Sequence, residues 1–497
     1  MKKTIFLLVM ALCLVVTGSV FAQRTDVNII TQVSPDSLDP SVSVMSYAYS
    51  VIVNISETLM TTDANDNLIP GLAESVDVNE DASEFVFKLR EGVKFHDGTD
   101  FTADDVVFTF EDIKARNLSN TAIIDSVTAL SDYGVKVTLT GPYAPFLGIT
   151  STVAFSIRPR EAATELGDSF GRNPVGTGPY KFAEWVEGEY IKLEAFEDYY
   201  LGAPEIKTAT FKFIGDTNTA LIAMEAGDAD YSAVWPDAAR FDIEANPDLK
   251  MLDYNSNSLQ FVSMNVQNEY LSDKKVRQAI NYAVNRDDIV IVAVEGMGRT
   301  TTQYCNVGTI GYVEGFDGYT YDVEKAKALM AESAYPNGFT VRLVAQDEMN
   351  SRLAQVMADN LSEIGINVEI EMQESNTAVA NMMAGNYEMC VLGIGNLYQD
   401  FDALRRLWTP SGSLQLSHTD PEDEQLLKIY DTMTQAAALG DTDARIELYK
   451  QAEEEIWDAA YYIPCFFPVR SHVMAANLNI EGLRATGYMH VYEMSWN

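Results

Sequence analysis

The sequence predicts a mixed α/β protein with two or more lobes, and three observations lead to this expectation. The chain has 497 residues, whereas a single hydrophobic core stops growing at roughly 250–300 residues. Residues 84–90 and 135–140 alternate apolar and polar side chains, as half-buried strands do. Residues 341–370 begin and end with such alternation around a helical apolar pattern, which predicts a strand, a helix and a second, parallel strand.

The first 22 residues have the organisation of a secretory signal peptide. Two lysines precede an apolar stretch at 5–16, and a small-residue exit ends at Ala22, so we expect cleavage after Ala22 and a mature chain that begins at Gln23. Cys13 follows Leu12 inside the apolar stretch, so no lipid anchor is expected there. No later segment approaches the roughly 20 apolar residues of a spanning helix. The sequence therefore predicts a soluble exported protein, most economically placed in a periplasm.

Acidic residues dominate the composition, with 73 Asp and Glu against 34 Lys and Arg and a formal charge of −39. Nucleic acid and anionic membranes would repel such a protein, because they are bound through basic surfaces. The acidic run at 453–455 is interpreted as a solvated helix face. Cys305, Cys390 and Cys465 remain after cleavage, and this odd number excludes a disulfide framework. Packed cores must therefore supply the stability.

Three further segments have the apolar spacing of amphipathic helices. Thr102, followed three residues later by Asp105, predicts a capped helix start, and the apolar stripe continues to Ile113. Residues 276–284 and 323–330 repeat apolar side chains at helical spacing. We find no internal repeat, low-complexity tract or proline-rich linker, so short crossovers must join the lobes.

A secreted serine hydrolase is the main alternative from another class of protein. Residues 167–171 match G-x-S-x-G with Ser169 in the nucleophile position, but that motif needs a strand before it and a helix after it. Residues 159–166 have a helical pattern instead, and Pro174 follows almost at once, so the context does not fit. The four histidines that could serve as a base are interpreted as turn or surface residues. They are His96, His418, His472 and His490.

A calcium-binding loop is the second local alternative. Asp63, Asn65, Asn67 and Glu74 match four of its ligand positions, but the position that requires glycine holds Leu68. We therefore expect a turn there, and the sequence predicts no metal site, no cofactor and no catalytic residue.

Five collinear segments together resemble the solute-binding proteins of family 5, whose members bind peptides or nickel complexes. Two of them include Phe87-Lys-Leu-Arg-Glu-Gly-Val-Lys-Phe-His-Asp-Gly98 and Gly176-Thr-Gly-Pro-Tyr180. The segments are 57–107, 176–200, 276–283, 321–329 and 353–366. One match of this kind is weak, whereas five in order across most of residues 30–475 are specific.

The resemblance implies a bilobed periplasmic-binding-protein-like fold of the class II, or cluster C, type with an extra lobe. In this family the first lobe is discontinuous. Mapped onto this chain, lobe I takes residues 23–56, 172–264 and 464–497, the extra lobe takes 57–171, and lobe II takes 265–463.

The function that the resemblance implies is that of a substrate-binding receptor of an ABC importer. Such a receptor captures a peptide or similar small solute by hinge closure and delivers it to permease subunits in the membrane. The chain lacks G-x-x-x-x-G-K-[ST], so separate subunits would have to bind ATP. We expect a monomer that is not an enzyme and binds no nucleic acid. A nickel complex, a sugar or another non-peptide solute remains an alternative ligand.

The candidate ligand loop follows an apolar strand that Gly393 and Gly395 interrupt, because glycine permits close backbone approach. Three polar residues of this loop are predicted to line the cleft, and Asp400 is the candidate partner of a ligand cation. They are Asn396, Tyr398 and Asp400, with Tyr47, Tyr49 and Trp235 as weaker candidates.

Three departures from the family pattern disfavour a free dipeptide. The family's ammonium-binding carboxylate falls near Leu397, its upstream tryptophan falls at Ile394, and residues 344–346 lack the arginine that pairs with a dipeptide carboxylate. Longer peptides, sugars and small cationic compounds remain open.

Overall fold

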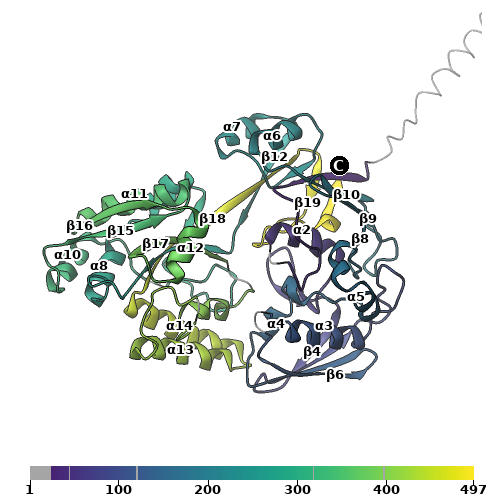
Figure 1. Ribbon diagram of the computed structural model, residues 1–497, viewed down its shortest axis with the longest axis horizontal. Helices are drawn as coiled ribbons and strands as arrows, with labels where there is room; N and C mark the ends of the chain where they lie inside the picture. The colour runs from purple at the N-terminus through teal and green to yellow at the C-terminus, as the bar shows by residue number, and fades with distance from the viewer. Residues whose placement is uncertain (1–23, 44, 119–120, 317, 396–397, 413) are drawn as a thin grey trace, which may run out of the picture.

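The structure is a computed structural model that describes residues 24–43, 45–118, 121–316, 318–395, 398–412 and 414–497. The predicted signal peptide and Asn396 lie outside these residues. Two sheets organise the chain: a long twelve-stranded sheet and a separate four-stranded one. Figure 1 shows the long sheet divided into two groups of strands, with the four-stranded sheet and its helices below one of them.

One group of strands, which we call the β1 side, centres on β1 (Asp26–Thr31), parallel to β10 (Thr208–Phe213). The order continues outward through β9 (Tyr190–Ala195) to β8 (Tyr180–Val186), both antiparallel. The other elements of this side are β11 (Tyr231–Ser232), β12 (Leu249–Asn255), β19 (Leu478–Ile480), β20 (Met494–Trp496), α2 (Ser46–Ile55), α6 (Thr217–Glu225) and α7 (Arg240–Ala245). Side chains of the N-terminal, middle and C-terminal segments share one core here.

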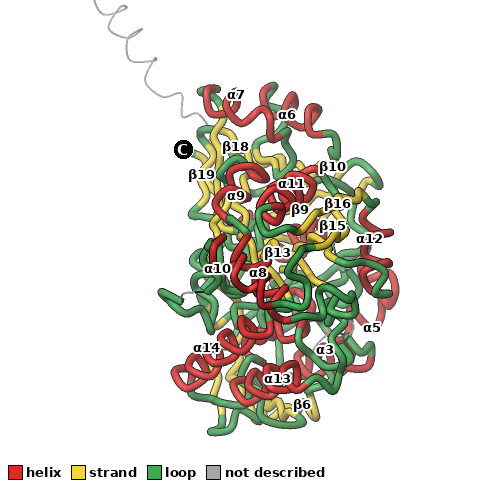
Figure 2. The backbone as a smooth tube through the Cα atoms, turned by 90° about the vertical axis from the view of Figure 1, so that its left-hand side faces the viewer, coloured by secondary structure: helices red, strands yellow, loops and turns green. Residues whose placement is uncertain are grey.

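The other group, the β13 side, contains the strand, helix and strand that the sequence predicts. These are β15 (Phe339–Ala345), α11 (Glu348–Ser362) and β16 (Ile366–Met372), and the two strands are parallel, as expected. The remaining elements are β13 (Ser258–Met264), β14 (Gly298–Thr300), β17 (Met389–Gly395), α8 (Lys274–Ala283), α9 (Arg286–Val294), α10 (Val323–Glu332), α12 (Ser375–Met383), α13 (Glu424–Ala437) and α14 (Thr442–Ala459). Figure 2 shows α8, α9 and α11 around β13, β15 and β16.

The four-stranded sheet forms a small-sheet unit at residues 73–166 with its own core. Thr102 and Asp105 form the expected capping box at the start of α3 (Ala103–Ala115), and Val106, Phe110 and Ile113 are buried. The other elements are β4 (Ala73–Val78), β5 (Glu84–Leu89), β6 (Ile124–Ser131), β7 (Gly134–Leu139), α4 (Phe146–Ile149) and α5 (Arg160–Leu166).

One strand joins the two sides of the long sheet. β18 (Tyr462–Ala475) pairs with β13 through Tyr462–Phe466 and with β12 from Val469 to Ala475. β12 and β13 are themselves separated by only Ser256 and Asn257. The backbone N–H of Ser256 donates to the carbonyl of Pro468 at 3.2 Å, so the two crossings lie side by side. Figure 1 shows β18 running between the two groups.

The structure bears on the calcium-binding loop and the serine-hydrolase motif that the sequence raised as alternatives. Asp63 accepts hydrogen bonds from the backbone of Asn65 and Asn67 in the turn between β2 (Met60–Thr62) and β3 (Leu68–Pro70), as expected of a turn. Ser169 lies in a 3₁₀ turn directly after α5, so the motif has no strand before it. Among the described cysteines, Cys305, Cys390 and Cys465 are buried and unpaired.

Two expectations about charged residues are wrong. Glu453 is buried, because the helical period turns it inward with Tyr449 and Ile456. Glu455 is buried on another side of the helix, where the hydroxyl of Thr432 on α13 donates to it at 2.8 Å. His472 is buried too and bonds to the hydroxyl of Tyr231 at 2.7 Å. Burial lowers the pKa of His472 to about 4, so its imidazole is neutral at physiological pH.

Candidate ligand-binding site

The glycine-interrupted strand of the sequence analysis is β17, and its two glycines differ in their surroundings. A Cβ on Gly393 would lie 2.7 Å from Nε2 of Gln260 on the neighbouring β13, whereas a Cβ on Gly395 would meet open space. Gly393 therefore leaves room for the Gln260 side chain, whereas nothing packs this closely at Gly395. The loop that follows begins at the end of the sheet that faces the β1 side, since Gly395 is paired with Ser258.

Asp400 is buried and already holds two donors. Its carboxylate forms an ion pair with Arg445 and accepts a hydrogen bond from the Tyr449 hydroxyl at 2.7 Å. It also caps the following 3₁₀ turn by accepting from the backbone N–H of Asp402 at 3.0 Å. Both side-chain donors come from α14, so in this conformation Asp400 fixes the loop to that helix.

Tyr398 is buried against the small-sheet unit. Its hydroxyl lies 3.1 Å from that of Tyr143 and donates to Asp402 at 3.3 Å. Tyr143 also donates to Asp402, and Arg405 lies 3.1 Å from the other oxygen of that carboxylate. Burial raises the pKa of Asp402 despite the opposing effect of Arg405. This group of four, the Tyr143 cluster, therefore connects the β13 side to the small-sheet unit.

The weaker candidates lie in other places. The Tyr49 hydroxyl donates to the carbonyl of Ser43 at 3.1 Å, and Tyr47 contacts Met45 near the start of α2. Trp235 donates from Nε1 to the carbonyl of Ser471 on β18 at 2.9 Å. The structure thus brings Tyr398 and Asp400 together on one loop, and it places Tyr47, Tyr49 and Trp235 on the β1 side.

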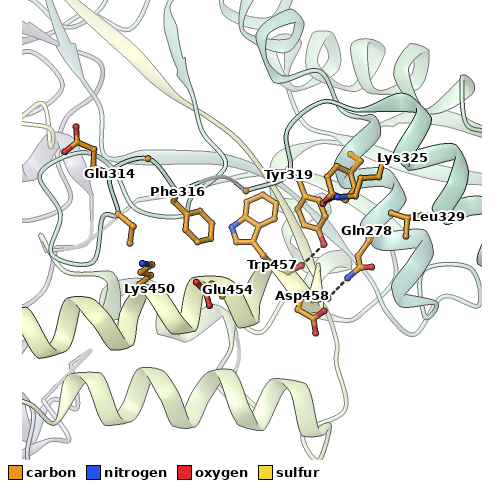
Figure 3. A pocket seen from close by; sticks show the side chains of 14 residues that line it. Gln278, Glu314, Phe316, Tyr319, Lys325, Leu329, Lys450, Glu454, Trp457 and Asp458 are labelled. Atoms are coloured by element: carbon orange, nitrogen blue, oxygen red, sulfur yellow. Dashed lines mark hydrogen bonds between the residues drawn. The ribbon is translucent and has the colours of Figure 1, made fainter.

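A pocket of about 580 Å³ lies within the β13 side, between α8, α10 and α14 (Figure 3). Aromatic rings of Phe316, Tyr319 and Trp457 line it, with Lys450 and Glu454 at its edge. Its lining residues come from 278–329 and 450–458 alone. A ligand in this pocket could not bridge the two sides of the long sheet, so the pocket does not explain hinge closure.

Sequence reasoning missed two arginines near the candidate loop, Arg299 and Arg406. The structure gives neither of them an acidic partner among the described residues, in contrast to Arg405 and Arg445. No local motif singles out Arg299, whose side chain contacts Asn306 nearby in the sequence and Phe467 far from it. No group of three or more His, Cys, Asp and Glu side chains suited to a metal ion occurs among the residues that the structure describes.

Comparison with known proteins identifies the class. The model of the bacterial extracellular solute-binding proteins, family 5, matches residues 67–414, and the chain belongs to this family. The glutathione-binding protein of Pectobacterium atrosepticum is 28% identical over 465 residues, which cover 89% of this chain and 88% of that protein.

Two solved structures share the architecture. The periplasmic binding protein DppA from Helicobacter pylori, in complex with the peptide STSA, superposes with a TM-score of 0.77 at 26% identity, covering 95% of this chain and 98% of that one. NikZ from Campylobacter jejuni, in complex with Ni(L-His), gives 0.78 at 24% identity, covering 95% and 99%. The mixed α/β, bilobed fold expected from the sequence is thereby confirmed. No described helix is long and apolar enough to cross a membrane.

Proposed function

We propose that this protein is the exported substrate-binding receptor of an ABC importer and that it captures a peptide or peptide-like solute by hinge closure. The observation that supports this most directly is the pair of crossings between the β1 side and the β13 side. Both crossings are short and hydrogen-bonded to each other, at Ser256 and Pro468. Such a connection permits rotation of the two sides while it keeps them in register.

The hinge also refines the expected division of the chain. A boundary at residue 264 would leave β13 in lobe I, yet β13 pairs along its whole length with β17. We therefore place the hinge at residues 256–257 and 467–468, with the β1 side as lobe I and the β13 side as lobe II. The small-sheet unit corresponds to the extra lobe.

The ligand class rests on the relatives. One relative is named for binding glutathione, and another was solved with the peptide STSA. Both are short peptides or peptide derivatives, and a cleft between two lobes suits a ligand of that size. The proposal includes cleavage after Ala22, a periplasmic location, a monomeric receptor, and permease subunits as its partners.

Mass spectrometry of the protein purified from its native compartment tests the proposal. We expect an intact mass that starts at Gln23, together with a retained peptide or peptide derivative in denatured samples. Calorimetry on stripped protein should then show one site per monomer. Ser169→Ala should bind equally well, and an esterase or peptidase activity that this variant abolishes would refute the binding-protein assignment.

A further inference from the structure

Most arginines in this acidic protein form an ion pair, whereas Arg299 and Arg406 have no acidic partner among the described residues. Arg277 and Arg286 are the instructive comparison, because they are buried and form no ion pair within the part of the chain that the structure describes. Each donates to several backbone carbonyls, such as those of Ala459 and Leu271 for Arg277 and Pro464 for Arg286. Their guanidinium groups are therefore saturated by the fold itself and need no ligand.

Arg406 is not saturated in this way. Its Nη2 donates to the carbonyl of Gly395 at 2.8 Å, while its Nε is shielded from solvent without a hydrogen-bond partner among the described residues. Burial lowers its pKa. An uncompensated, partly buried guanidinium is costly unless an anion joins it. Arg406 therefore has an unused hydrogen-bond donor, and it contacts Gly395, the last residue of β17 before the candidate ligand loop.

Arg299 lies on β14, and it too has no acidic partner among the described residues. Its guanidinium donates to the side chain of Asn306 and lies 5.2 Å from the ring centre of Phe467, the residue at the second crossing. Burial lowers the pKa of Arg299 as well. Its recorded partners are neutral, so this positive charge is also uncompensated by the protein.

A continuous series of contacts places both arginines at the same end of the β13 side. Asn306, the partner of Arg299, donates to the carbonyl of Ser256 at 3.0 Å. Two residues later, Ser258 is paired with Gly395, whose carbonyl binds Arg406. Both guanidinium groups are therefore linked to the residues where the chain crosses to the β1 side.

We propose that Arg299 and Arg406 bind the free carboxylate of the ligand, so that the receptor selects peptide-like solutes with an unblocked acid group. This inference rests on the proposed function. The planar guanidinium matches a carboxylate in two parallel hydrogen bonds, and the acid would supply the charge that each arginine lacks. The overall charge of −39 does not oppose such binding, because the local environment of a site decides its affinity.

Calorimetry with acid and blocked forms of two probes tests the inference on wild-type protein. The probes are glutathione against its glycine ethyl ester, and Ser-Thr-Ser-Ala against its C-terminal amide. We expect at least one acid form to bind at least about 10-fold more tightly than its blocked form, since truncating one partner of a buried charge pair is costly. Equal affinities for acid and blocked forms would overturn the inference while the proposed function stands.

Variants connect this selectivity to the two arginines. Arg299→Gln and Arg406→Gln should each reduce the affinity for the acid form by about 10-fold or more and leave that for the blocked form nearly unchanged. Arg299→Lys and Arg406→Lys should lose less, and thermal melting checks that each variant is folded. Arg352→Gln, which removes an exposed arginine from α11, is the matched control.

Two further outcomes are decisive. A folded pair of Gln variants that keeps the full preference for the acid form assigns the carboxylate to other residues and refutes the inference. If wild-type protein binds none of the four probes and retains no peptide-like compound on purification, the proposed function fails, and the inference fails with it.

Discussion

The carboxyl group of Glu453 lies in the interior of the β13 side, and its ionisation affects the free energy of unfolding. Its Oε1 accepts a hydrogen bond from the backbone N–H of Tyr304 at 3.2 Å, while Oε2 has no partner among the described residues. Burial raises its pKa to about 8 from an ordinary value of 4.5. Between these two values the folded protein holds a proton that the unfolded chain has released, so stability falls as the pH rises.

Replacing this carboxyl group by an amide should remove that loss. We expect Glu453→Gln to match wild type at pH 4 and to exceed its free energy of unfolding by up to about 5 kcal/mol at pH 9, since one pKa unit corresponds to about 1.4 kcal/mol. Urea denaturation across this pH range measures the difference. The adjacent Glu454→Gln, at the edge of the open pocket, should keep the wild-type profile. Identical pH profiles for Glu453→Gln and wild type would contradict the assignment.

Asp400 pairs with the buried Arg445, so a loss of ligand binding on its substitution could come from a loss of stability. Asp400→Ala leaves Arg445 buried without its charge partner, so we expect the free energy of unfolding to fall by about 3–5 kcal/mol. The double variant Asp400→Ala/Arg445→Ala should lose less than the sum of the single losses, because the two residues are coupled. Chemical denaturation tests this, and additive losses would argue against the ion pair.

The ligand role of Asp400 remains a separate prediction. It requires calorimetry on an Asp400→Ala variant shown to be folded, with Asp400→Asn for comparison. Unchanged affinity in the folded alanine variant would remove that role. A large loss in both variants would favour charge pairing with the ligand.

Helices and strands that depend on interactions between residues near one another in the sequence were predicted from their apolar spacing and capping residues. β15, α11 and β16 follow from their own apolar periods, and their parallel pairing follows from the length of the crossover. The capped start of α3 follows from Thr102 and Asp105 in the same way. The inward turn of Glu453 was also available from the helical period, since Tyr449 and Ile456 share its face, but three consecutive glutamates suggested solvent instead.

The site could be predicted only in part, because its partners are distant in sequence. The glycine-interrupted strand is β17, which ends at Gly395 as the sequence indicates, but nothing near Asp400 indicates that Arg445, on another helix, neutralises it. Likewise, no local pattern within β18 indicates that it exchanges β13 for β12 after Phe466. The apolar period of a segment does not indicate which distant strand it pairs with.

The Tyr143 cluster is the element-scale contact between the small-sheet unit and the β13 side. The backbone N–H of Ala144 adds a hydrogen bond to the carbonyl of Ala437 at 2.7 Å. Tyr143→Phe keeps the ring but removes the donor to the buried Asp402 carboxylate, so we expect faster amide hydrogen exchange at 143–150 and 434–440. Tyr133→Phe, in the same unit, is the control. Unchanged exchange in both segments would show that the hydroxyl does not hold the contact.

For the whole molecule, hinge closure predicts a change in shape that ligand binding must produce. The two crossings, Ser256–Asn257 and Phe467–Pro468, are short, and the proposed closure is a rotation of the two sides of the sheet about them. A ligand shifts the open and closed populations only through its different affinity for them. Small-angle scattering of stripped protein should therefore show a smaller radius of gyration when a compound that binds in calorimetry is added. A non-binding compound at the same concentration is the control.

The same measurement on Arg299→Gln separates binding from closure. At a ligand concentration that saturates wild type but not the variant, the variant should keep the larger radius, and raising the ligand concentration should restore compaction. The reason is that Arg299 lies on the β13 side. Its substitution should weaken ligand binding there and leave closure itself intact. Saturating calorimetric binding to wild-type protein without any decrease in radius would exclude closure about this hinge.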